Sequence, residues 1–116
     1  MKNVMRLGVL VLACVFALSI SGCASNRAEI QKIEAEMETL KSDIENKKLA
    51  VDAAFVSYQQ ADGIYSEYLL RGMLEESEEW EEIKTQKYYT WQECKKELEE
   101  MEREYTKLNN QLSRLR

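Results

Sequence analysis

Apolar residues recur along the first half of the chain at alternating steps of three and four residues. This first seam consists of Ile30, Ile33, Met37, Leu40, Ile44, Lys47, Val51, Ala54, Tyr58, Ala61, Tyr65 and Tyr68, and Lys47 is its one charged member. Steps of three and four average 3.5 residues, which keeps one stripe of a helix against a partner helix and gives a left-handed supercoil. The pattern predicts a long coiled-coil helix over residues 29–71.

A second seam with the same spacing follows later in the sequence. It consists of Trp91, Cys94, Leu98, Met101, Tyr105, Leu108, Leu112 and Leu115, and Trp80 extends it backward past Lys84 and Lys87. This seam predicts a second coiled-coil helix over residues 78–115. The two seams are out of phase with each other, so we expect an interruption between Tyr68 and Trp80.

The interruption contains residues that end and begin helices. Gly72 can terminate the first helix, and Ser77 can cap the second. We therefore predict an all-α fold in which two long amphipathic helices form a coiled-coil helical hairpin with a connector over residues 72–77. Asp62-Gly63 is a competing break, and one long helix in an oligomeric coiled coil is the alternative architecture.

Charges beside the seams do not distinguish a hairpin within one chain from a coiled coil between chains. In an antiparallel hairpin centred near residue 75, Glu34 lies opposite Arg116, which is favourable. The same hairpin places Asp43 opposite Glu104, which is unfavourable, whereas a parallel pairing of the first helix with its twin brings opposite charges together. Neither helix is stable alone in water, so pairing within the chain or between chains must bury the seams.

The amino-terminal residues have the composition of an export signal. Lys2 and Arg6 are followed by an apolar stretch over residues 7–20, which is too short for a spanning helix of roughly 20 residues. We expect residues 1–22 to be this signal. The signal closes with Ile20-Ser21-Gly22. Together with Cys23 these residues form a four-residue box that resembles the lipobox of bacterial membrane lipoproteins.

The lipobox resemblance implies cleavage between Gly22 and Cys23 and attachment of lipid to Cys23. Diacylglycerol would be joined to the thiol and a fatty acid such as palmitate to the new amino group, with residues 23–28 as a tether to the membrane. Ala24 occupies the position at which an aspartate retains enterobacterial lipoproteins in the inner membrane. In a Gram-negative cell we therefore expect a lipid-anchored protein of the outer membrane that faces the periplasm.

Composition narrows the possible partners and activities. The 116 residues contain no histidine and no proline, and beyond residue 22 there are 14 basic against 21 acidic side chains. An acidic helical protein repels nucleic acid, so we expect no nucleic-acid partner. The sequence also has no nucleophile elbow, glycine-rich phosphate loop or metal-ligand pattern, so we predict neither an enzyme nor a cofactor or metal site.

Three features remain as candidates for interaction. Cys94 is the one cysteine after Cys23, and it is either a small buried residue of the seam or an intermolecular disulfide across a symmetric dimer. The acidic run from Glu75 to Glu82 is a solvated helix start or, alternatively, a loose calcium site. Aromatic residues crowd the middle of the chain, which predicts an aromatic hairpin tip. Phe55 and Tyr89 lie off the seams and are the rings that we expect to contact another molecule.

A lipobox followed by heptads is an architecture similar to that of the murein lipoproteins. That family ends in a lysine that is joined to peptidoglycan, whereas this chain ends in Arg116, so we expect no covalent attachment by that route. The sequence predicts a lipid-anchored coiled-coil structural or scaffold protein of the bacterial cell envelope, which forms a homo-oligomer or binds an envelope protein. The alternative is an accessory lipoprotein that docks on a secretion, transport or lysis assembly.

Overall fold

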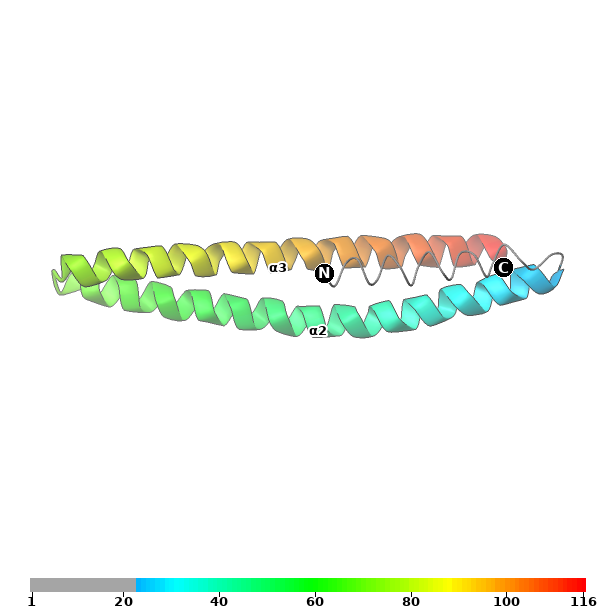
Figure 1. The fold of residues 1–116 in the computed structure, drawn as a ribbon, viewed down its shortest axis with the longest axis horizontal. Helices are drawn as coiled ribbons and strands as arrows, with labels where there is room; N and C mark the ends of the chain where they lie inside the picture. The colour runs from blue at the N-terminus through cyan, green and yellow to red at the C-terminus, as the bar shows by residue number, and fades with distance from the viewer. Residues whose placement is uncertain (1–22) are drawn as a thin grey trace. The chain divides into compact units, whose positions relative to one another are not determined.

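Over residues 23–116, the fold consists of two long helices joined by a short turn. The computed structural model describes residues 23–116, and side chains from residue 26 onward. Helix α2 spans Cys23–Leu70 and helix α3 spans Leu74–Leu115 (Figure 1). The predicted all-α coiled-coil helical hairpin is confirmed, and the alternative of one continuous helix is wrong. The expected export signal, residues 1–22, lies outside the described residues.

The chain divides into two compact units, and each unit contains part of both helices. Unit 1 combines the part of α2 before Lys41 with Tyr105–Arg116 of α3, and unit 2 is Lys41–Glu104. Three cross-helix pairs in unit 2 are Lys47 with Glu97, Phe55 with Trp91, and Asp62 with Lys84. The residue number falls on α3 as it rises on α2, so the two segments of unit 2 run antiparallel.

Both predicted seams form the contact between the helices. All twelve positions of the first seam and all eight of the second, from Trp91 onward, are buried or half-buried. The buried apolar residues are Ile33, Leu40, Ile44, Ala61 and Leu112, and all of them are seam positions. The 3.5-residue spacing therefore identified the faces that pack, because it keeps each stripe in contact with the partner helix over many turns.

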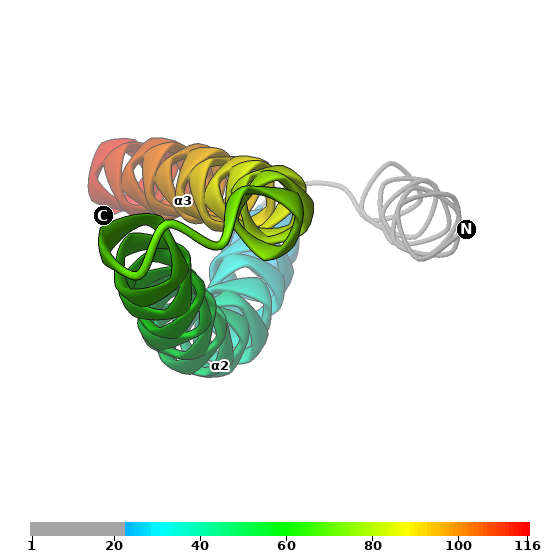
Figure 2. The ribbon, with the colours of Figure 1, turned by 90° about the vertical axis from the view of Figure 1, so that its left-hand side faces the viewer.

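Gly72 ends helix α2 as predicted. Its φ of 74° lies in the left-handed region that glycine adopts without steric cost. The Gly72 amide donates to the Leu69 carbonyl at 3.1 Å, and the Met73 amide donates to the Tyr68 carbonyl at 3.0 Å. These two hydrogen bonds form a Schellman motif, which satisfies carbonyls at the helix end and turns the chain toward α3 (Figure 2). Gly63, the competing break, lies within α2.

The connector is shorter than expected, because α3 begins at Leu74 and not at residue 78. Ser77 is therefore inside the first turn of α3 and does not cap it. Its amide donates to the Met73 carbonyl at 2.9 Å, and its hydroxyl donates to the Leu74 carbonyl at 2.9 Å. A serine whose hydroxyl is satisfied by its own helix can be buried, and Ser77 is 3% exposed. At the other end, the expected tether of residues 23–28 belongs to α2.

Substitution of the two described glycines by alanine is expected to change the free energy of unfolding in opposite directions. A Cβ atom at either Gly63 or Gly72 would meet nothing within 4 Å, so only the backbone distinguishes them. We expect Gly72→Ala to lower the free energy of unfolding by about 1 kcal/mol, because alanine is strained at positive φ. We expect Gly63→Ala to raise it by about 1 kcal/mol through helix propensity. Urea unfolding followed by circular dichroism measures both, and equal signs would contradict the Schellman assignment.

Candidate functional site

An aromatic cluster in unit 2 joins the two helices. It consists of Phe55, Tyr58, Tyr88, Tyr89 and Trp91. The Trp91 ring lies 4.8 Å from Phe55 and stacks on Tyr58 at 5.8 Å with an interplanar angle of 13°. Tyr88 meets Tyr58 edge-on at 5.6 Å, Tyr89 at 5.7 Å and Trp91 at 6.0 Å. These centroid separations lie in the range where aromatic pairs attract one another beyond their burial.

Helical spacing positions four of these rings. Phe55 and Tyr58 are three residues apart on α2, and Tyr88 and Trp91 are three apart on α3, so each pair shares one helix face. The cluster is open on its outer side, where Tyr88 is 40% exposed and Tyr89 is 66% exposed. It is therefore a packed internal contact with an aromatic edge that remains accessible.

Of the two rings off the seams, the structure changes the role expected for Phe55 and leaves that of Tyr89 as it was. Phe55 is half-buried against Trp91, so it belongs to the internal packing. Its position is next to the first seam, and a ring of this length reaches into the contact between the helices. Tyr89 is mostly exposed, and its contact with another molecule stays a prediction.

The hairpin tip is aliphatic, whereas the sequence predicted an aromatic one. We define the tip as Leu69, Leu70, Met73 and Leu74, which are 49%, 89%, 37% and 66% exposed. They flank Gly72 at the end of the hairpin that faces the viewer in Figure 2. The signal was present in the sequence, since four apolar residues surround the turn without belonging to either seam. Their exposure follows from the shortness of the turn, which leaves no chain to cover them.

Acidic residues border the tip on α3. Five of the six glutamates of the run are exposed: Glu75, Glu78, Glu79, Glu81 and Glu82. Among the described residues, no group of three or more acidic or cysteine side chains is arranged to hold a metal ion. On the other side of the turn, Arg71 is paired with Glu67 at 2.6 Å. The tip is thus an apolar surface with an acidic border.

Cys94 lies on the second seam, where it is half-buried and has a free thiol. This position agrees with a small apolar side chain between the helices. A disulfide to a second copy stays a prediction.

An ion pair also joins the two helices of unit 2 beside the aromatic cluster. Lys84 Nζ lies 3.2 Å from Asp62 Oδ1 and 4.5 Å from the centre of the Tyr65 ring. The hydrogen bond to Asp62 raises the pKa of Lys84, and burial opposes this shift to a smaller extent. Lys47 and Glu97 form a second such pair at 2.6 Å.

The raised pKa of Lys84 predicts that the free energy of unfolding falls at alkaline pH. Because the folded pKa lies above the unfolded value of 10.5, the pair contributes fully below pH 10.5, and the contribution is lost as pH rises through the folded pKa. We expect Asp62→Asn to lower the pKa of Lys84 and to remove this part of the pH dependence. An NMR titration of the lysine ε-methylene signals measures it, and an unchanged Lys84 pKa would show that Asp62 is not the cause.

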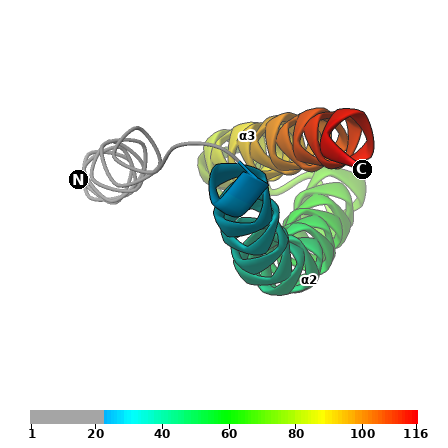
Figure 3. The same cartoon turned by 90° about the vertical axis from the view of Figure 1, so that its right-hand side faces the viewer.

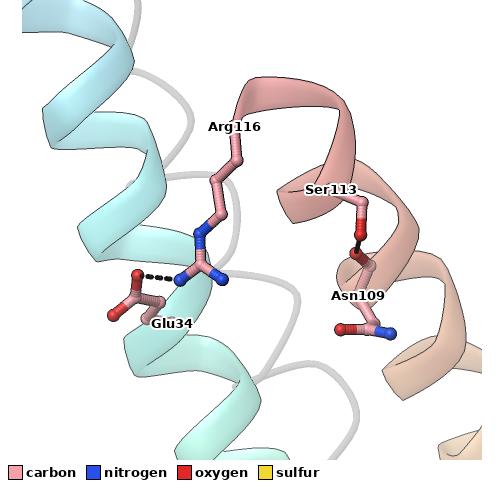
Figure 4. A network of polar contacts seen from close by, with 4 residues as sticks. All are labelled: Glu34, Asn109, Ser113 and Arg116. Atoms are coloured by element: carbon pink, nitrogen blue, oxygen red, sulfur yellow. Dashed lines mark hydrogen bonds and ion pairs between the residues drawn. The ribbon is translucent and has the colours of Figure 1, made fainter.

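In unit 1, Arg116 Nη2 lies 2.9 Å from Glu34 Oε1 (Figure 4). The antiparallel register predicted this pair, and it is confirmed. Ser113 donates to the Asn109 carbonyl at 3.0 Å within α3. Figure 3 views this end of unit 1, where α2 begins and α3 ends. Both partners of the ion pair are exposed, so the contact agrees with the antiparallel register but adds little to stability.

Comparison with known proteins gives no match: no family model matches the chain, and no curated protein or solved structure is significantly similar to it. Neither described helix has a stretch apolar enough to cross a membrane. Three surfaces of the described residues are exposed: the aromatic edge at Tyr88 and Tyr89, the hairpin tip, and the sides of the helices that face away from the seams.

Proposed function

We propose that this protein is a lipid-anchored coiled-coil scaffold of the bacterial cell envelope. The lipobox supports the anchor, because its small residues and cysteine follow a basic and then an apolar segment of signal-peptide length. More than one acyl chain on Cys23 would make the attachment stable, since a single chain binds membranes only marginally. Ala24 favours the outer membrane in a Gram-negative cell.

The observation that carries the scaffold role is the continuity of helix α2. The helix begins at Cys23, the residue that would carry the lipid, and continues without a break to Leu70. A helical segment is stiffer than a flexible linker of the same length. An anchor joined directly to a helical hairpin suits a scaffold that keeps envelope proteins close to a membrane.

Metabolic labelling tests the anchor with a matched control. The full chain is expressed in bacteria grown with a radiolabelled or alkyne-tagged palmitate analogue. We expect label on the wild-type chain and on Cys94→Ser, and none on Cys23→Ser, because only the Cys23 side chain accepts diacylglycerol in this proposal. Label that persists on Cys23→Ser, or a wild-type chain without label, would overturn it.

The exposed hairpin tip favours a second candidate, an accessory lipoprotein that binds an envelope protein. Four exposed apolar residues with an acidic border fit a partner that offers an apolar recess lined at its rim by lysine or arginine. Oligomeric state separates the two roles, because a scaffold that associates with itself sediments as an oligomer. An adaptor that needs its partner sediments as a monomer.

A further inference from the structure

Helix α2 carries a second, unpartnered face in unit 2. Asn46, Leu49, Ala53, Val56 and Gln60 recur at steps of three and four, and we call them the outer face of α2. All five are exposed, with Leu49 at 68% and Val56 at 49%. They lie on the side of α2 opposite the first seam, because residues at this spacing share one face of a helix. The outer face is therefore a coiled-coil stripe with no partner among the described residues.

Charge sets this face apart from the rest of the molecule. Between Leu49 and Gln60, Asp52 is the only charged residue, although 32% of the chain is charged. The matching outer positions of α3, also exposed, are Gln86, Tyr89, Glu93, Lys96 and Glu100. Three of those five are charged, as is usual for the solvent side of a coiled coil. The outer face of α2 thus departs from the pattern that its partner helix follows.

We infer that the outer face of α2 packs against the same face of a second copy of this chain. Unit 2 has 17 acidic against 9 basic residues, so two copies repel each other at most surfaces. The uncharged outer face is where they can approach without that repulsion, and one patch that serves both copies makes a closed, symmetric contact. A membrane surface fits less well, because residues 49–60 contain no lysine, arginine or tryptophan.

Association also adds burial that the hairpin lacks. Five apolar residues are buried in the described chain, and no large side chain there is fully buried. A small domain of this kind gains stability when an oligomer removes more apolar surface from water. The inference rests on the proposed anchor in one respect: copies held by their amino termini in the same membrane would pair their α2 helices in parallel.

Sedimentation of the full chain in detergent tests the surface. We expect a dimer for the wild type and a monomer for Leu49→Glu/Val56→Glu, with the dissociation constant raised at least about 100-fold by like charges brought together. Gln86→Glu/Lys96→Glu is the matched control, because it places two glutamates at exposed positions on the outer face of α3. We expect it to remain dimeric. A monomeric wild type, or a Leu49→Glu/Val56→Glu chain that stays dimeric, would overturn the inference.

Disulfide cross-linking in membranes tests the same contact without charged substitutions. In a full chain that carries Cys94→Ser, we expect Leu49→Cys to form a covalent homodimer on mild oxidation. Lys96→Cys and the Cys94→Ser parent are expected to give none beyond background, since a disulfide needs Cα atoms within about 7 Å. Cross-linking of Leu49→Cys to a different protein, or no homodimer, would contradict pairing between parallel copies. Neither experiment depends on palmitate labelling, so failure of the anchor is seen separately.

Discussion

Replacement of Trp91 by alanine is expected to cost about 3 kcal/mol of unfolding free energy, among the largest losses from any single substitution. The Trp91 ring contacts Phe55 and Tyr58 on α2 and Tyr88 on α3, so it links the helices at the centre of the aromatic cluster. Lys95 Nζ also lies 4.9 Å above the ring. Alanine removes these contacts together and leaves a gap that the two helices cannot close without moving.

Tyr89→Ala is the control for this prediction. Tyr89 belongs to the same cluster but is 66% exposed and contacts only the Tyr88 ring among the pairs described. We expect it to change the unfolding free energy by less than about 0.5 kcal/mol, as is usual for exposed positions. Urea unfolding followed by circular dichroism measures both variants. Equal losses would mean that Trp91 does not connect the helices in solution.

Leu40→Ala is expected to cost about 2 to 3 kcal/mol. Leu40 is a seam residue that is 8% exposed, and truncation of a buried leucine loses its transfer free energy and opens a cavity. This loss lies at the low end of the range for such changes, because a contact between two helices can collapse around the gap.

Leu70→Ala provides the matched control at the hairpin tip, where the same side chain is 89% exposed. We expect a change below about 0.5 kcal/mol, because little apolar surface returns to water. Thermal or urea unfolding distinguishes the two variants. A Leu70→Ala chain as unstable as Leu40→Ala would show that the tip is covered in solution, most directly by another molecule.

The tip and the outer face of α2 have different chemical characters. The tip is a short aliphatic surface with glutamates beside it, which favours a partner of opposite charge. The outer face is long, periodic and nearly uncharged, which favours a second copy. The two surfaces share no residue, so a substitution in one of them leaves the other unchanged.

Local pattern alone indicated the helices and their packing faces. Heptad spacing is a property of neighbouring residues, so the spacing by itself places Ile33, Leu40 and Leu112 in the contact between helices. Local pattern offered two candidate ends for α2, Gly72 and Gly63, because a helix end needs only one backbone to adopt positive φ, and the structure shows that the end is at Gly72. The resemblance of residues 20–23 to a lipobox is equally local, and the lipid anchor that it implies stays a prediction.

Only the tertiary structure decided which stripes pair with each other. An apolar stripe is buried equally well by the same chain or by a twin, so the spacing left the hairpin and the oligomer both open. The pair of Glu34 with Arg116 was compatible with the hairpin but did not select it, because surface ion pairs contribute little. Phe55 became internal and the tip residues stayed exposed for a related reason. The exposure of a side chain depends on where the second helix lies, and contacts between residues distant in sequence fix that position.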